Sequence, residues 1–135
     1  MDIFEQLRRD EGVRRFPYAD SVGKLTIGVG HNLTDNGLTE VQIEHILADD
    51  VAEASTALSM LPWYGGLDEV RKAVLVNMAF NIGVAGLLGF HKMLSLLELG
   101  KYDEAAAEMM NSKWADQVGA RAKRLSMQLA SGQWT

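Results

Sequence analysis

The chain has 135 residues and no cysteine, with 47% hydrophobic residues, 23% charged residues and a net charge of -5. These values fit one globular domain that buries its core without disulfides or thiolate metal sites. Residues 31–70 contain eight acidic residues and no Lys or Arg, whereas the rest carries 13 basic and 10 acidic residues. This pattern argues against nucleic-acid binding. It is compatible with an anionic polymer held by the basic part, and equally with a solvated acidic helix face.

The first residues lack the basic and apolar regions of a signal peptide, so we expect none. The mostly apolar run at 73–82 is interrupted by Asn77 and Asn81 and is too short to cross a bilayer. We therefore expect no stable insertion into a membrane.

The N-terminal third combines one helix with the only β pattern in the chain. Apolar residues at helical spacing predict a helix over 3–11, which Gly12 ends. Residues 14–30 alternate around a turn at 20–23, which predicts a hairpin, or a hairpin with one more short strand. The Asn, Asp and Gly residues of 32–38 predict a loop.

The remaining chain predicts helices only. Thr39 and Gln42 form a capping box for a helix that runs to about residue 58. Asp68 caps a helix that Gly83 stops and whose apolar surface predicts a buried centre. Shorter helices are expected at about 84–88, 90–99, 102–110 and 120–130.

These elements predict an α+β fold that is mostly helical. We expect a single domain, 1–135, with a cleft between two lobes. Residues 12–38 form a small β lobe, residues 39–58 form a connecting helix, and residues 1–11 and 59–135 form a helical lobe.

Glu11 and Asp20 are candidates for acid–base chemistry, because a helix end and an adjacent hairpin turn can present two carboxyl groups to one substrate. Glycoside hydrolysis needs one protonated carboxyl for the leaving oxygen and one ionised carboxylate for water or direct attack. With 18 acidic residues present, spacing alone also allows a chance pair. The three histidines show no metal-ligand spacing, and no serine-nucleophile or phosphate-binding motif occurs, so we expect no metal and no cofactor.

The chain resembles the phage-type lysozymes, the family of the T-even phage enzyme. The resemblance rests on the spacing of Glu11, Asp20 and Thr26, with eight and then five residues between them. The following segments carry it along nearly the whole chain: Asp2-Ile3-Phe4-Glu5, Asp10-Glu11-Gly12, Tyr18-x-Asp20, Thr26-Ile27-Gly28-x-Gly30-His31, Leu67-Asp68-x-Val70-Arg71, Asn77-Met78-x-Phe80, Asp103-Glu104-Ala105-Ala106, Trp114, Arg121-Ala122-Lys123-Arg124 and Gly132-x-Trp134.

The resemblance implies a lysozyme-like fold and a muramidase, an endolysin that hydrolyses the β-1,4 bond between N-acetylmuramic acid and N-acetylglucosamine in peptidoglycan. Glu11 would protonate the leaving oxygen, while Asp20 and Thr26 would hold the attacking water. Arg121 would pair with Glu11, and Asp50 would form an ion pair with His31. The expected substrate-binding residues are His31, Phe80, Asn81, Met93 and Glu108.

Three of these positions depart from the family pattern, because Asn81 replaces an expected Gln, and Met93 and Glu108 replace polar groups. The β lobe is also short, with only eight residues between Gly30 and Thr39. Two alternatives stay open, an inactive peptidoglycan-binding relative and a lytic transglycosylase. Retention of both water-holding residues favours an inverting hydrolase. Because we expect no signal peptide, we expect synthesis in the host cytoplasm, and we expect a monomer. The resemblance implies that the protein then acts at the cell wall, in the periplasm, during host lysis.

Overall fold

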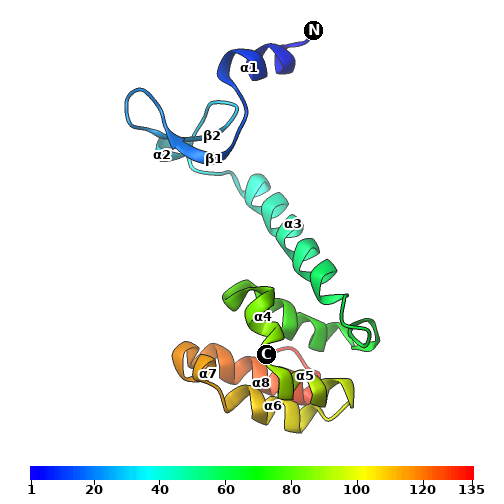
Figure 1. Cartoon of the computed structure of the whole chain (residues 1–135). Helices are drawn as coiled ribbons and strands as arrows, with labels where there is room; N and C mark the ends of the chain where they lie inside the picture. Colours follow the sequence, from blue (N-terminus) through cyan, green and yellow to red (C-terminus); the bar gives the residue numbers. More distant parts are fainter. The chain divides into compact units, whose positions relative to one another are not determined.

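The computed structural model describes all 135 residues, which form two compact units, Met1–Leu47 and Ala48–Thr135. The N-terminal unit contains α1 (Ile3–Glu11), β1 (Arg14–Ala19), β2 (Leu25–Gly28), β3 (His31–Asn32) and α2 (Leu33–Asn36). Figure 1 labels α1, β1, β2 and α2. The three strands form an antiparallel sheet in the order β1-β2-β3. This confirms the prediction of a hairpin with one additional short strand.

Helix α1 has the predicted bounds because both of its ends are capped. Asp2 accepts a hydrogen bond from the Glu5 amide at 2.9 Å, and the Glu5 carboxylate accepts one from the Asp2 amide at 3.0 Å. This capping box satisfies two amides that the first helical turn leaves without partners. At the other end, Gly12 has a φ of 75° and its amide donates to Arg8 O at 2.9 Å. Glu11 is therefore fixed as the last residue of the helix.

The short helix α2 lies in the segment predicted to be a loop, so that prediction is wrong. Asn32 caps α2, because its side-chain oxygen accepts a hydrogen bond from the Asp35 amide at 3.0 Å. One turn of helix is too short to show an apolar repeat, and the Asn and Asp residues that suggested a loop are also those that cap helices.

The long helix α3 (Glu40–Leu58) begins at the predicted capping box. The Thr39 amide donates to Gln42 Oε1 at 2.8 Å, and the Gln42 amide donates to Thr39 Oγ1 at 3.2 Å. The boundary between the two units falls inside this helix. The predicted grouping of residues 1–11 with the helical lobe stays a prediction.

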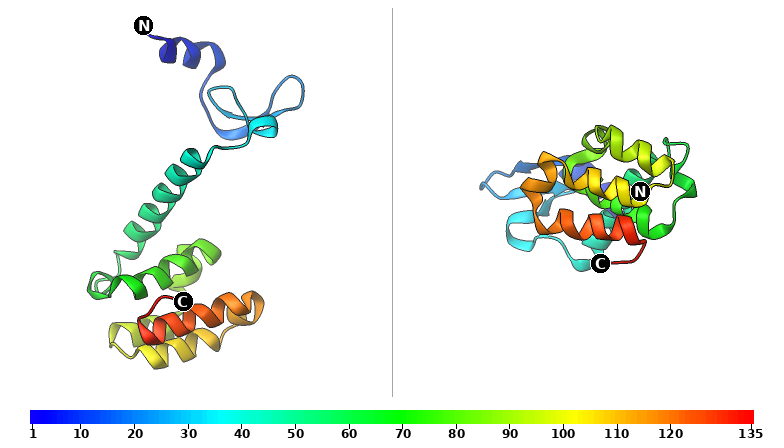
Figure 2. Two further views of the ribbon diagram at one scale, coloured as in Figure 1. Left: turned by 180° about the vertical axis from the view of Figure 1, so that it is seen from behind. Right: turned by 90° about the horizontal axis from the view of Figure 1, so that it is seen from below.

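The C-terminal unit is helical. Its elements are the second half of α3, the 3-10 turn η1 (Tyr64–Gly66), α4 (Glu69–Leu88), α5 (His91–Glu98), α6 (Tyr102–Met110), α7 (Lys113–Val118) and α8 (Ala120–Ser131). Helix α6 packs along α8 and against α5, as Figure 2 shows. The largest fully buried side chains of the C-terminal unit are Leu58, Val74, Leu75, Met78, Leu87, Met93, Met109 and Leu129. Removal of this apolar surface from water stabilises the unit.

Helix α4 is interrupted at Gly83, whose angles of φ 78° and ψ 160° are non-helical, so its residues form two helical stretches that meet at a kink. This confirms the predicted stop at Gly83 and the short helix expected after it. Helix α4 is long and apolar enough to cross a membrane by length and composition. Its buried residues belong to the core cluster of the helical unit, which is the role expected of a core helix. Helix α7 was not predicted. Its six residues begin at Lys113, and Ser112 caps the helix because its hydroxyl oxygen accepts a hydrogen bond from the Ala115 amide.

Arg71 joins α4 to the end of α8. Its guanidinium donates to Leu129 O at 2.7 Å and to Ala130 O at 2.9 Å, and lies 3.7 Å from the ring centre of Tyr102. These contacts satisfy carbonyl groups at the C-terminus of α8 that have no partner inside the helix. Asp68 pairs with the same guanidinium at 3.1 Å and caps α4. Asp68 thus supports both the start of α4 and the position of Arg71.

We predict that Asp68→Ala lowers the free energy of unfolding by about 1 kcal/mol at neutral pH, the usual effect of losing an N-cap. Burial raises the pKa of Asp68, but hydrogen bonds from the Arg71 amide and guanidinium, together with charge attraction, lower it more, so it falls below 3.8. A lowered pKa stabilises the fold above the ordinary Asp pKa, and this contribution is lost as the pH falls through the folded value. Urea unfolding should show that the difference in the free energy of unfolding between wild type and Asp68→Ala shrinks below about pH 4. A difference that is unchanged in acid would contradict the lowered pKa of Asp68.

Candidate active site

Glu11 lies at the end of α1, and its carboxylate lies against the turn between β2 and β3. A Cβ atom placed on Gly30 would lie 3.1 Å from Glu11 Oε2 and 3.3 Å from its Cδ. Gly30 also has a φ of +68°, a conformation that L side chains rarely adopt. The glycine therefore lets backbone approach the carboxyl group closely. Glu11 itself is exposed within its unit, so a substrate can reach it.

Asp20 lies in the turn between β1 and β2, where one of its carboxylate oxygens holds the turn. Asp20 Oδ1 accepts hydrogen bonds from the Val22 amide at 3.0 Å and the Lys24 amide at 2.8 Å. Asp20 Oδ2 accepts none from the protein. The carboxylate is thus fixed through one oxygen and has a second oxygen free to accept a hydrogen bond from water.

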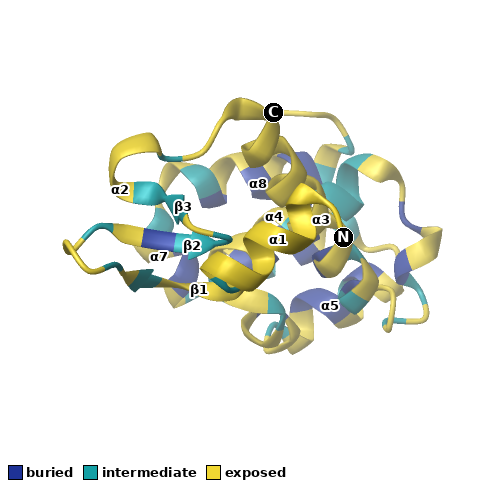
Figure 3. Ribbon diagram, turned by 90° about the horizontal axis from the view of Figure 1, so that it is seen from above, coloured by how far each residue is buried: buried dark blue, intermediate teal, exposed yellow.

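Thr26 is the only buried residue of the N-terminal unit, with 4% of its surface exposed, and it forms the buried segment of β2 in Figure 3. It pairs with Tyr18 on β1 and with Asn32 on β3. Its hydroxyl donates to Lys24 O at 2.9 Å. Because that bond uses the only proton of the hydroxyl, Thr26 Oγ1 can act further only as an acceptor.

The three predicted catalytic residues therefore belong to one unit, and two of them are joined through Lys24. Sequence reasoning did not identify Lys24, because its contribution comes from its backbone atoms, which no residue pattern reveals.

His31 lies on β3 and is partly buried. Its Nε2 atom lies 2.6 Å from Gly37 O. A carbonyl oxygen only accepts, so Nε2 must carry a proton, which fixes the orientation of the ring. Asp50, on α3, lines a pocket of about 440 Å³ together with Glu53 and Phe80. The predicted ion pair of His31 with Asp50 joins residues of different units and stays a prediction.

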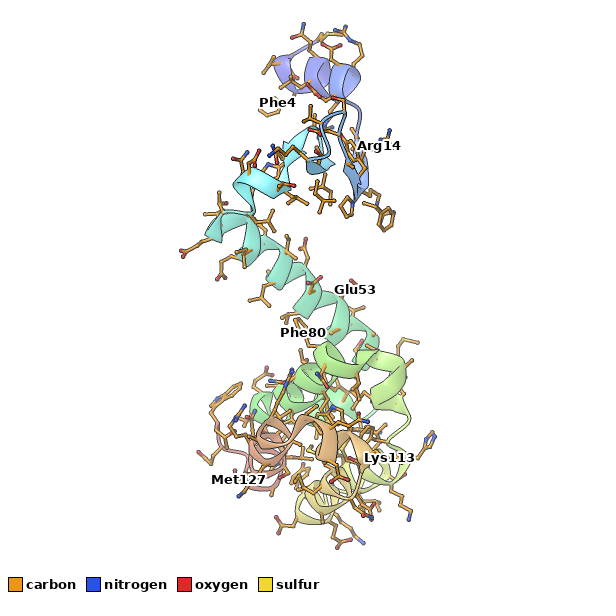
Figure 4. The ribbon with its side chains drawn as sticks, turned by 90° about the vertical axis from the view of Figure 1, so that its left-hand side faces the viewer. Phe4, Arg14, Glu53, Phe80, Lys113 and Met127 are labelled. Atoms are coloured by element: carbon orange, nitrogen blue, oxygen red, sulfur yellow. The ribbon has the colours of Figure 1, made fainter.

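The helical unit brings several predicted substrate-binding residues to its surface. Phe80 projects from α4 and is 46% exposed (Figure 4). Asn81 Oδ1 accepts a hydrogen bond from Trp114 Nε1 at 2.7 Å. Indole N–H is only a donor, so the Asn81 amide is held with its NH₂ group outward. Both N–H groups of the Asn81 amide stay free to donate to a sugar oxygen.

Met93 and Glu108 line a pocket of about 530 Å³ with Phe90 and Ser112. The structure thus brings these two predicted residues together. Met93 is only 1% exposed and belongs to the hydrophobic core, so it forms the base of the pocket rather than its rim. Their role toward sugars stays a prediction.

Arg121 extends from α8 to α4, where it is held by a residue that sequence reasoning did not assign. Its Nε and Nη2 donate to Asn77 Oδ1 at 2.9 and 2.7 Å, and Nη2 also donates to Asn77 O at 3.1 Å. Both residues line a pocket of about 580 Å³ with Phe80 and Trp134. The predicted pairing of Arg121 with Glu11 again joins the two units and stays a prediction.

No group of three or more His, Asp or Glu side chains is arranged to hold a metal ion.

The chain is similar to known proteins over most of its length. Residues 8–128 match the phage lysozyme family. The chain is 29% identical to "Probable T4-type lysozyme 1" of Dictyostelium discoideum, over 96% of this chain and 94% of that protein. It is 31% identical to "Probable T4-type lysozyme 2" of the same organism, over 90% and 89%. It is 32% identical to an endolysin of Acyrthosiphon pisum secondary endosymbiont phage 1, over 81% and 74%.

The chain is a member of the phage lysozyme family. The alignment with the first Dictyostelium protein extends over 160 residues, more than this chain contains, so that protein has residues that are missing here.

We predict that Gly30→Ala lowers activity on peptidoglycan by about three- to tenfold, because the new Cβ shifts the Glu11 carboxylate slightly, and small displacements of reacting groups are costly. The matched control is Gly28→Ala. Gly28 has the same φ of +68° but nothing within 4 Å of its added Cβ. Both variants should lose about 1–2 kcal/mol of stability from backbone strain. The measurement is the rate at which each variant clears suspended cell walls, well below both melting temperatures. Gly30→Ala should clear them more slowly than Gly28→Ala. Equal activities would show that the Glu11 contact is unimportant.

Proposed function

We propose that the protein is an endolysin-type lysozyme that hydrolyses the β-1,4 bond between N-acetylmuramic acid and N-acetylglucosamine in peptidoglycan. The observation that carries this proposal is that Glu11 and Asp20, both in the N-terminal unit, have different surroundings. Glu11 is exposed and held only by close packing against Gly30, whereas Asp20 is fixed by two backbone amides. Two carboxyl groups in such different surroundings suit the separate roles of acid and water-holder.

In the proposed reaction Glu11 donates its proton to the glycosidic oxygen as the bond from that oxygen to C1 breaks. A water molecule attacks C1 from the opposite face, and the free Oδ2 of Asp20 accepts one of its protons. Thr26 Oγ1 accepts a hydrogen bond from the same water. The products are two shorter glycan chains, one with a new reducing end, and exchange with solvent returns the protons to their starting positions.

The helical unit would bind the glycan through Phe80, Asn81 and the pocket of Met93 and Glu108. His31 would contribute from the N-terminal unit, and Arg121 and Asp50 would support the site. We propose further that the protein acts as a monomer at the cell wall during lysis of a host cell. The family membership and the endolysin among its relatives support this role.

Glu11→Gln should lose about 100- to 10,000-fold in activity, because it keeps the size of the side chain but removes the transferable proton. The measurement is the rate at which purified protein clears suspended cell walls. Glu5→Gln is not a suitable control because Glu5 caps α1, so the exposed Glu98 of α5 provides it, as Glu98→Gln. Clearing by Glu11→Gln at the wild-type rate would disprove the assignment of the acid.

The reaction should invert the configuration at C1. Inverting enzymes place their two carboxyl groups about 6.5–9.5 Å apart to leave room for water, whereas retaining enzymes place them at about 5 Å for direct attack. The Thr26 hydroxyl, which can accept from a water, fits the inverting arrangement. Proton NMR of the first-formed reducing ends, recorded before mutarotation, should show the α-anomer. An initial β-anomer would instead make Asp20 a nucleophile.

A further inference from the structure

The backbone of Lys24 connects the two residues that are proposed to hold the water. Its amide donates to Asp20 Oδ1 at 2.8 Å. Its carbonyl oxygen accepts from the Asp20 amide at 2.8 Å and from Thr26 Oγ1 at 2.9 Å. A shift of this one residue would therefore move both the Asp20 carboxylate and the Thr26 hydroxyl.

The side chain of Lys24 is in turn tied to α2. Lys24 Nζ lies 3.0 Å from Asp35 Oδ1. Asp35 Oδ2 accepts a hydrogen bond from Asn32 Nδ2 at 2.9 Å, and Asn32 is the β3 partner of Thr26 in the sheet. The contacts form a closed ring through Lys24, Asp35, Asn32 and Thr26, with Asp20 attached at Lys24.

A second contact reinforces the tie between α2 and the sheet. The Leu25 amide, next to Lys24, donates to Thr34 Oγ1 at 2.7 Å. Thr34 and Asp35 are neighbours on α2, so two consecutive residues of this short helix hold Leu25, the first residue of β2, and Lys24, which precedes it. The helix thus fixes the strand end at the point where Lys24 contacts Asp20.

We propose that Asp35 is a positioning residue for catalysis, which holds Asp20 and Thr26 in place through Lys24 and Asn32. The catalytic part of this inference rests on the proposed function. The contacts that link Asp35 to Lys24 and Asn32, called the brace below, are a property of the fold. Asp35 makes its contacts to protein groups through both carboxylate oxygens. In this proposal Asp35 acts on the reaction through Lys24 and Asn32.

The effect should be modest, because the Lys24 and Asp35 side chains are 40% and 50% exposed and such ion pairs are weak. We expect Asp35→Ala to lower kcat by about three- to tenfold on soluble glycan strands, with KM unchanged, because reacting groups tolerate little displacement. Added salt should narrow the difference, since it screens the ion pair of the wild type.

Asp49→Ala is the matched control. Asp49 is an exposed aspartate on α3 without a side-chain hydrogen bond or ion pair, so the change alters net charge equally and breaks no contact. It should leave kcat and KM at wild-type values. An equal fall of kcat in both variants would overturn the proposal.

A double-mutant cycle with Lys24→Met tests the pathway. Lys24→Met keeps the backbone contacts but removes the ammonium group. Lys24→Met breaks one of the two contacts that Asp35→Ala breaks, so the double variant should have the same kcat as Asp35→Ala alone. Effects that multiply would show that Asp35 does not act through Lys24.

Hydrogen exchange of the Lys24 amide gives a readout that does not need activity. This amide is bound to Asp20 Oδ1, so Asp35→Ala should accelerate its exchange about three- to tenfold, whereas Asp49→Ala should not. Unchanged exchange in folded Asp35→Ala would refute the brace whatever the enzyme does. If the wild type cuts no glycan but the exchange result holds, the proposed function fails and the brace stands.

Discussion

The hydrogen bonds to the backbone of Lys24 are the constraint on which the candidate site depends. Asp20 comes from a turn and Thr26 from a strand, and no direct contact between their side chains holds them together. The Lys24 amide and carbonyl oxygen bind both within 2.9 Å. The same turn leaves one oxygen of Asp20 free, so the contacts that fix the carboxylate do not consume its capacity to bind water.

Hydrogen bonds and glycines, more than apolar packing, determine the local geometry of the N-terminal unit. Thr26 is its only buried residue. Its shape instead follows from caps at Asp2 and Asn32, from the sheet ladder and from Gly30, which brings backbone against Glu11. The helical unit is the opposite case, because buried Leu and Met residues fill its core and its polar ties, such as Arg121 to Asn77, lie around that core.

This contrast explains how far the sequence could predict the structure. Long helices with caps were predicted closely, as α1 and α3 show, because their apolar repeats and capping residues extend over several turns. Helices α2 and α7 were missed because each is too short to establish a repeat. Glu11, Asp20 and Thr26 could be singled out by their spacing once a family was in view. Lys24 and Asp35 could not, because they act through backbone atoms and through a contact between residues that are distant in the sequence.

The central claim is that water, held by Asp20 and Thr26, attacks the sugar once Glu11 has donated its proton. The most direct measurement is the chemical nature of the ends formed when the purified protein digests isolated peptidoglycan, read by mass spectrometry with and without borohydride reduction. The account predicts new N-acetylmuramic acid reducing ends that borohydride reduces. Anhydro ends would mean that no water attacks and that the protein is a transglycosylase, and the absence of new ends would leave only binding; either result would contradict the account.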